Sequence, residues 1–255
     1  MPAGSEHIVK SFDEELKQLS QVIVQMGGLA EAQLQMAIEA LSRRDPEAAR
    51  ETIAHDARIN ELEDQVDAMT VRMLALRQPM AQDLREVVAA LKISGAVERI
   101  GDYAANVAKR VLTLSQLPQV KPLHAIPRMG RLAQELLKDV LDAYIEHDAD
   151  KAIRVWERDE EVDEMYTSLF RELLTYMMED PRNISACTHL LFIAKNIERI
   201  GDHSTNIAET IHFLVRGRPL EATRPKGDKS SYAVVTPGDE AGIEGGGDGS
   251  GDGGR

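Results

Sequence analysis

Glu198-Arg199-Ile200-Gly201-Asp202 occurs twice in this chain, because the same five residues stand at 98–102. Each copy lies inside a helical pattern of apolar residues, and Asn106 and Asn206 follow the two copies at the same distance. Within each copy the two carboxylates are four residues apart, so a helix places them on one face, one turn apart. A glycine inside a helix costs about 1 kcal/mol relative to alanine. The repeated glycine therefore indicates the close approach of another helix or of a bound group.

The rest of the chain repeats around this motif. Met26-Gly27 reappears as Met129-Gly130, and Asp56 reappears as Asp159, both at an offset of 103. The motif itself repeats at an offset of 100, so the first repeat has three more residues, which we assign to the turn around 78–83. Insertions are best tolerated in turns. The sequence therefore predicts two similar three-helix units, each with its own apolar seam.

Helical spacing of apolar residues continues through both units. We expect helices over about 11–44, 46–77, 80–115, 128–147, 149–178 and 181–216, and no strand. Asp45-Pro46 ends the first helix and begins the second, with Asp as the N-cap and Pro at the first helical position. The apolar positions of the first three helices include Leu19, Ile23, Met26, Leu34, Leu41, Ile59, Leu62, Met73, Leu76, Leu84 and Leu91.

These patterns predict an all-α fold of two tandem three-helix bundles. The first bundle covers 11–117 after a flexible N-terminus at 1–10, and the second covers 128–216. Between them, three prolines within 118–127 exclude a continuous helix and mark a linker. Eleven of the 18 glycines lie in 217–255, with Asp, Glu and Ser. Such a segment buries too little apolar surface to offset its ordering entropy, so we expect a disordered acidic tail.

Charge and composition narrow the classes of function. The net charge is −13, and the tail from 227 onward accounts for −4 of it, so the folded part is acidic as well. This argues against nucleic-acid binding, which needs a basic face. Cys187 is the only cysteine, which excludes a disulfide framework and fits a reducing compartment. We find neither a signal peptide nor a membrane-spanning run, and we expect a cytoplasmic protein.

The second helix of each unit carries acids that can face the repeated motif. Asp159 and Asp163 form a pair four residues apart, whereas the first unit has Asp56 followed by Asn60. Carboxylates gathered on one patch repel each other and attract a cation, and all-oxygen ligands suit magnesium, calcium, manganese or oxidised iron. We expect the fuller second set to bind a metal ion more tightly.

A solvated helix face is the alternative interpretation of these acids, because Arg99 and Arg199 can neutralise them. On either interpretation we expect Glu198 and Asp202 to be exposed. Glu209 and His212 have the spacing of di-iron bundles, but such sites need two copies and the sequence has one. With no nucleophile–base pair and no phosphate-binding glycine loop, we expect no enzymatic activity.

At the repeated motif the sequence also resembles the PhoU family of phosphate-uptake regulators, over about residues 7–216. The resemblance rests on 12–16 (Phe-Asp-Glu-Glu-Leu), on Arg77-Gln78-Pro79 through Asp83-Leu84-Arg85, and on 174–181 (Leu-Thr-Tyr-Met-Met-Glu-Asp-Pro). It also includes both copies of the Glu-x-x-x-Asp signature. It implies two three-helix bundles, usually in a homodimer. It further implies a cytoplasmic adaptor that holds the phosphate-starvation response off when phosphate is plentiful.

The resemblance also implies partners and a site. The partners are the ATPase subunit of the phosphate ABC transporter and a membrane sensor histidine kinase, so contact with the membrane is only through them. Some family members bind iron or zinc on the acidic signature. The positions carried over are Glu98, Asp102, Glu198 and Asp202, with Asp56, Asp159 and Asp163 as partners. The rival interpretation is a carboxylate-bridged metal-binding, metal-storage or metalloenzyme helical protein, and a second alternative is a structural adaptor without metal.

Overall fold

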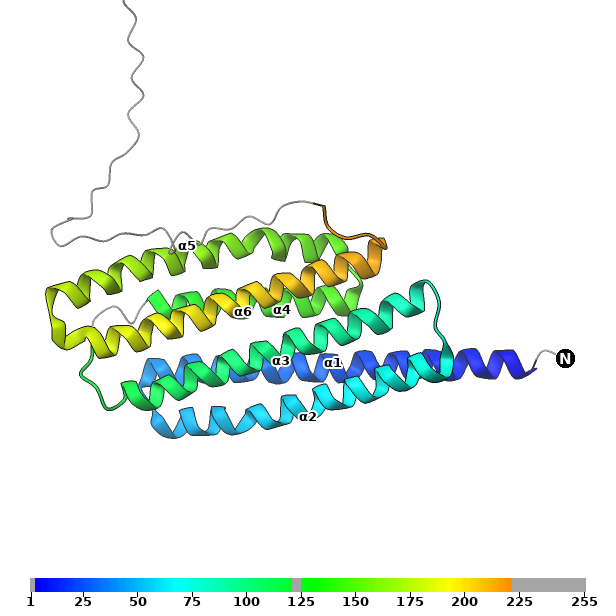
Figure 1. Ribbon diagram of the computed structural model, residues 1–255, viewed down its shortest axis with the longest axis horizontal. Coiled ribbons are helices and arrows are strands. Elements are labelled where there is room, and N and C mark those ends of the chain that lie inside the picture. The colour runs from blue at the N-terminus through cyan, green and yellow to red at the C-terminus, as the bar shows by residue number, and fades with distance from the viewer. Residues whose placement is uncertain (1–2, 121–124, 222–255) are drawn as a thin grey trace, which may run out of the picture.

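The computed structural model describes residues 3–120 and 125–221, which form six long α-helices, one short 3-10 turn and no strand (Figure 1). The expected all-α fold is therefore confirmed. The helices are α1 (Ala3–Arg43), α2 (Pro46–Arg77), α3 (Gln82–Leu114), α4 (Ala125–Glu146), α5 (Ala149–Glu179) and α6 (Ile184–Arg216), with the 3-10 turn at Pro181–Asn183. No helix in these ranges is apolar over a stretch long enough to cross a bilayer.

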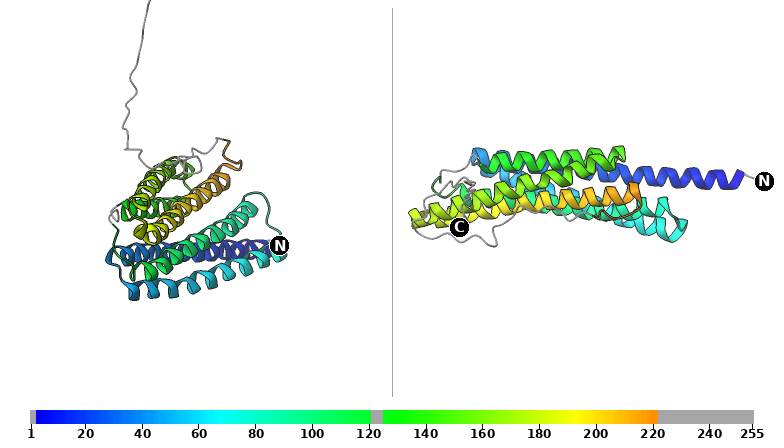
Figure 2. Two further views of the ribbon diagram at one scale, coloured as in Figure 1. Left: turned by 60° about the vertical axis from the view of Figure 1, so that its left-hand side comes forward. Right: turned by 90° about the horizontal axis from the view of Figure 1, so that it is seen from above.

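The six helices form two antiparallel three-helix units. α1, α2 and α3 pack together in one unit, and α4, α5 and α6 pack in the other. The units join along two seams, with α3 against α6 and α1 against α4 (Figures 1 and 2). Apolar positions fill the interior, and Leu19, Ile23, Met26, Leu34 and Leu41 of α1 are at most 1% exposed. The two expected three-helix bundles thus share one continuous core.

The seam between α1 and α4 shows that the units are related by an approximate two-fold rotation. A Cβ added at Gly27 of α1 would lie 2.6 Å from a methyl carbon of Leu141 in α4. A Cβ at Gly130 of α4 would lie 2.5 Å from Cδ1 of Ile38 in α1. Gly130 and Leu141 are the repeat counterparts of Gly27 and Ile38, at the offset of 103. Each contact is therefore made twice with the roles exchanged, as at the interface of a symmetric dimer.

Local side chains begin the second helix of each unit. Asp45 Oδ1 accepts hydrogen bonds from the backbone N–H groups of Glu47 and Ala48, 2.9 and 3.1 Å away. Asp148 caps α5 in the same way. Each cap supplies an acceptor for N–H groups that have no partner within the helix. The expected start of the second helix at Asp45-Pro46 is confirmed.

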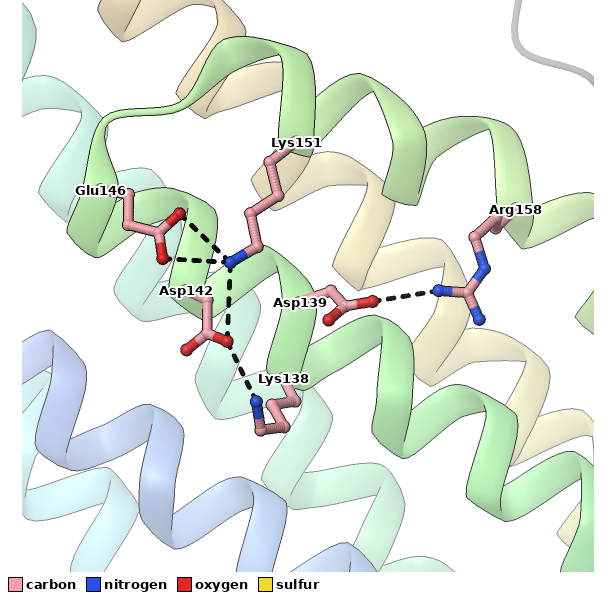
Figure 3. A network of polar contacts seen from close by, with 6 residues as sticks. All are labelled: Lys138, Asp139, Asp142, Glu146, Lys151 and Arg158. Carbon is pink, nitrogen blue, oxygen red and sulfur yellow. Dashed lines mark hydrogen bonds and ion pairs between the residues drawn. The ribbon is translucent and has the colours of Figure 1, made fainter.

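Ion pairs align α5 on α4 (Figure 3). Lys151 Nζ of α5 lies 3.2 Å from Glu146 Oε2 and 3.7 Å from Asp142 Oδ2 of α4. Further along α5, Arg158 Nη1 lies 3.0 Å from Asp139 Oδ2. Partly exposed pairs of this kind contribute little stability, typically below about 1 kcal/mol each. They favour one register of α5 on α4.

The structure corrects several boundaries. Helix α1 begins at Ala3, so Ser11 lies inside a helix and does not cap it. Helix α4 begins at Ala125, because Pro127 is tolerated in a first helical turn, where its missing N–H has no partner to lose. The predicted linker is correspondingly shorter, and 121–124 lie outside the described residues. The predicted tail lies outside them too, except for 217–221, where Leu220 packs on the core.

Three apolar residues that the helical period includes are exposed. Leu76 is 69% exposed, Leu84 40% and Leu91 41%. Leu76 lies in the last turn of α2 and Leu84 in the first turn of α3. Helical spacing alone cannot show which apolar positions other helices cover.

Candidate functional site: two acidic helix faces

The second acidic set consists of Asp159 and Asp163 on α5 and Glu198 and Asp202 on α6. Asp159, Asp163 and Glu198 are 1%, 3% and 4% exposed, and the Asp202 side chain is 16% exposed. The expectation that Glu198 and Asp202 are exposed is therefore wrong. The reason is the antiparallel packing of α5 on α6, which covers this face of the repeated motif. The acids are enclosed between two helices and do not form a solvated face.

Basic side chains on α6 balance part of this charge. Lys195 Nζ lies 2.8 Å from Glu198 Oε1, and it also lies 4.8 Å from the centre of the Tyr166 ring. Arg199 Nη1 lies 3.2 Å from Asp202 Oδ2. The ammonium group thus contacts a carboxylate and an aromatic face together, and both attract a cation. The second acidic set contains its own counter-ions.

The repeated glycine is explained by the packing of a helix against it. A Cβ at Gly201 would overlap Oδ1 of Asp159 on α5. A Cβ at Gly101 would lie 2.8 Å from Cδ1 of Ile59 and 3.6 Å from Oδ1 of Asp56 on α2. Because both glycines lack a side chain, the acid-bearing helix of the same unit packs closely against them, as the sequence predicts. They bring Asp56 and Asp159 to equivalent places beside the two copies of the motif.

The first acidic set consists of Asp56 on α2 and Glu98 and Asp102 on α3. Asp56 Oδ1 accepts a hydrogen bond from Gln33 Nε2 at 3.4 Å. Arg99 lies between the other two, with Nη1 3.2 Å from Asp102 Oδ2 and Nε 3.5 Å from Glu98 Oε2. The Glu98 and Asp102 side chains are 15% and 35% exposed. This set is therefore more open to solvent than the second.

Glu63 joins the first set, although the sequence pattern did not lead us to expect it there. It lies on α2 seven residues after Asp56. Burial is the largest cause of the raised pKa of Glu98, the charges of Asp102 and Glu63 act in the same direction, and Arg99 opposes them. Two helical turns separate Glu63 from Asp56, so the helical period was the signal that could have identified it.

The repeats differ most at the position three residues before the motif. The second unit has Lys195 there, and the first unit has Gly95. Opposite this position the second unit has Tyr166 and the first has Glu63, at the offset of 103. At these two positions the first set therefore has one additional acid, whereas the second set has a lysine and an aromatic ring. The expectation that the second set binds a cation more tightly receives no support from this arrangement.

Burial has a strong effect on the chemistry of Glu198. Its removal from water raises its pKa to about 7, and the nearby charge of Asp202 acts in the same direction. The hydrogen bond from Lys195 and the charge of Arg199 oppose this shift. A carboxyl group with such a pKa gains or loses its proton near neutral pH.

The side chains as they lie do not form a metal centre. Within 3–120 and 125–221, no three His, Cys, Asp or Glu side chains are arranged so that they could hold a metal ion. Arginine and lysine nitrogens occupy the immediate surroundings of Glu98, Asp102, Glu198 and Asp202. As they lie, these carboxylates are paired with protein cations, and holding the iron or zinc that the resemblance implies would require the side chains to rearrange. Metal binding stays a prediction, and metal analysis of protein purified without chelators tests it.

The fold and these two acidic faces define a class, which is a duplicated helical bundle with an acidic motif repeated on its third and sixth helices. A comparison with protein-family models identifies that class. The PhoU domain model matches residues 23–111 and 126–211, one match for each three-helix unit. The chain belongs to the PhoU family.

Relatives and solved structures agree with this assignment. A protein of Caulobacter vibrioides, "Phosphate-specific transport system accessory protein PhoU homolog", is 55% identical over 88% of this chain and 98% of its own length. The Serratia marcescens accessory protein PhoU is 40% identical over 85% of this chain and 89% of its own. The crystal structure of PhoU from Pseudomonas aeruginosa matches with a TM-score of 0.79 and 39% identity, over 81% of this chain and all of that one.

Proposed function

We propose that this protein regulates phosphate transport and holds phosphate uptake and the phosphate-starvation response off when phosphate is plentiful. The observation that carries the proposal is the similarity to the Caulobacter protein, which is named for phosphate-specific transport and matches over 98% of its length. The similarity extends over 88% of this chain, and the family model matches both three-helix units, which supports a shared role of the whole molecule. A match to one unit alone would support only a shared module.

The proposed regulator acts by binding in the cytoplasm and not by catalysis. It couples the ATPase subunit of the phosphate ABC transporter to a sensor histidine kinase and works as a homodimer. The acidic net charge of −13 supports protein partners over nucleic acid. Elongated helical bundles offer long side faces on which two partners can bind at separate places.

The turn between α2 and α3 is the contact surface that we propose for the ATPase subunit. It carries exposed apolar side chains, and Leu76 and Met80 are 69% and 79% exposed. Gln78 and Ala81 adopt positive φ angles of 49° and 51°, which cost free energy in residues other than glycine. Strained backbone and exposed apolar surface together are typical of binding sites. The three extra residues of the first repeat also fall here.

Binding of the purified full-length chain to the purified ATPase subunit tests this proposal. We expect the wild type to bind, and we expect Met80→Asp to weaken binding without lowering the melting temperature, because Met80 is largely exposed. Met178→Asp is the matched control, since Met178 is an exposed methionine near the corresponding turn of the second unit. Absence of wild-type binding, or equal effects of the two variants, would contradict the proposed contact.

A further inference from the structure

A groove of about 440 Å³ lies between residues 106–113 of α3 and residues 189–196 of α6. These two helices run side by side along the seam between the units (Figure 1). Three of the described residues that line the groove are basic, namely Lys109, Arg110 and Lys195. The described lining contains no Asp or Glu. Positive charge is thus concentrated here in a protein whose net charge is −13. We call this site the basic groove.

Arg110 is held in place by uncharged neighbours. Its guanidinium carbon lies 4.1 Å from the centre of the Phe192 ring, and its Nη1 lies 3.3 Å from Nδ1 of His189. Arginine only donates hydrogen bonds, so Nδ1 must accept this one. The ring proton of a neutral His189 is then on Nε2, where it is a further donor. Burial and the charge of Arg110 lower the pKa of His189, which agrees with a neutral ring.

The two lysines differ in how far their charge is balanced. Lys195 Nζ lies 2.8 Å from Glu198 Oε1, so a carboxylate already accompanies it. Lys109 Nζ donates to the amide oxygen of Asn106 at 3.3 Å, and that oxygen carries no net charge. The contacts of Lys109 and Arg110 thus hold both side chains without supplying an anion. Their charge is available to a ligand.

The internal repeat provides a second groove for comparison. A groove of about 630 Å³ lies at the other end of the seam between α3 and α6, and most of its lining positions are repeat counterparts of those in the basic groove, at the offset of 100. Where the basic groove has Lys109 and Arg110, the second groove has Glu209 and Thr210. Glu209 accepts a hydrogen bond from Trp156 Nε1 at 3.0 Å. The fold therefore forms a groove at this position with or without these two cations. Only the basic groove has a Lys and an Arg at these two positions.

We propose that the basic groove binds a phosphate-type oxyanion, either inorganic phosphate or the phosphate group of a small ester. Guanidinium and ammonium groups form their strongest hydrogen bonds with such oxygens. The volume lies within the range of small-molecule sites. The choice of phosphate among oxyanions rests on the proposed function, whereas the capacity to bind an oxyanion rests on the groove alone.

Calorimetric titration of the purified full-length chain at constant ionic strength tests the proposal, with inorganic phosphate and glycerol 3-phosphate as the two probes. The wild type should bind at least one probe saturably. The double variant Lys109→Glu, Arg110→Thr places the residues of the second groove in the basic groove. It should bind about tenfold more weakly or worse, because two charge-assisted hydrogen bonds are lost.

Lys92→Ala is the matched control, because Lys92 is a cation of the second groove on the same helix. It should leave the affinity within about twofold of the wild type, since it is distant from the basic groove. Tighter binding of inorganic phosphate would identify the free anion as the ligand, and tighter binding of the ester would identify an organic phosphate. A melting curve of each variant checks folding, and Lys109→Glu alone replaces the double variant if that one is unfolded.

Equal affinities of the wild type and the double variant would overturn the proposal, as would the absence of saturable binding by either probe. These measurements need neither the transporter nor the kinase. A failure of the oxyanion site is therefore distinguishable from a failure of the regulatory role, which is measured in cells and with purified partners.

Discussion

Glu198 is a carboxylic acid enclosed between α5 and α6, and this enclosure makes the stability of the protein depend on pH. Burial raises its pKa to about 7, above the value of 4.5 for an unperturbed Glu. When the pH lies between these two pKa values, Glu198 retains its proton in the folded state but has lost it in the unfolded chain. The contribution of Glu198 to stability is therefore most favourable below the lower value and becomes less favourable as the pH rises toward 7. Above pH 7 the full penalty applies, on the order of 3 kcal/mol.

Replacing this acid by its neutral isostere should remove the penalty. We predict that Glu198→Gln raises the free energy of unfolding by up to about 3 kcal/mol at pH 8.5 and changes it little at pH 5. Urea denaturation at the two pH values measures the difference. Glu98→Gln, at the equivalent but more exposed position, should show a smaller pH dependence. An effect of Glu198→Gln that is the same at both pH values would contradict the proposed role of burial.

At this scale the sequence predicts which acids share a helix face but not what surrounds them. The spacing of Glu198 and Asp202 is sufficient to place them one turn apart. The burial of Glu198 depends on how α5 lies across α6, and that register is set by contacts between residues distant in sequence. The helical period places Lys195 near Glu198 and Glu63 on the face of Asp56, so both could have been identified as neighbours of the acids. The contact of Lys195 with Tyr166 and the effect of Glu63 on Glu98 depend on another helix and could not be predicted.

The helices themselves cross closely where glycines remove side chains from the seam. Gly27 lies on the face of α1 that meets Leu141 of α4, whereas a Cβ added at Gly28 would meet no atom of another helix within 4 Å. Alanine at an open helical position stabilises a helix by about 1 kcal/mol relative to glycine. Alanine in a filled position forces its neighbours apart, which costs about 1–3 kcal/mol.

These adjacent residues form a matched pair for mutation. We predict that Gly28→Ala raises the free energy of unfolding by about 1 kcal/mol and that Gly27→Ala lowers it by about 1 kcal/mol. Urea denaturation of the two single variants measures both effects against the wild type. Equal stabilisation by the two substitutions would show that α1 and α4 do not approach as closely as described.

Helix number, order and most boundaries follow from the sequence because caps and prolines act locally. Asp45-Pro46 and Asp148 fix helix starts through hydrogen bonds within two or three residues. The exceptions are positions where a local pattern predicts a helix boundary that the structure does not have. The capping-box pattern at Ser11 lies inside a longer helix, and Pro127 falls in the first turn of α4. The exposure of Leu76 depends on which residues of other helices pack against it, and no local pattern records that.

At the scale of the whole molecule, duplication explains both the architecture and the divergence of its sites. The two units are related by an approximate two-fold rotation, which repeats the α1–α4 glycine contact with the roles exchanged. The acidic faces and the grooves along the α3–α6 seam are then present in pairs. Within each pair the residues differ, as Lys195 and Gly95 do.

The tail gives a separate prediction. Cutting the chain after Glu221 should leave the melting temperature unchanged, because composition predicts that 222–255 bury little apolar surface. The cut retains Leu220, which packs on the core. A calorimetric scan of the truncated and full-length chains measures the difference. A clear fall in the melting temperature would show that the tail packs on the folded part.

Uptake of radiolabelled phosphate by phosphate-replete cells tests the central claim most directly. The cells lack the gene for this chain and carry either an empty vector or the full-length wild type. We predict that uptake is raised in cells with the empty vector and returns to the parental rate when the chain is restored. Parental uptake in the absence of the chain would contradict the proposed role as a negative regulator of phosphate transport.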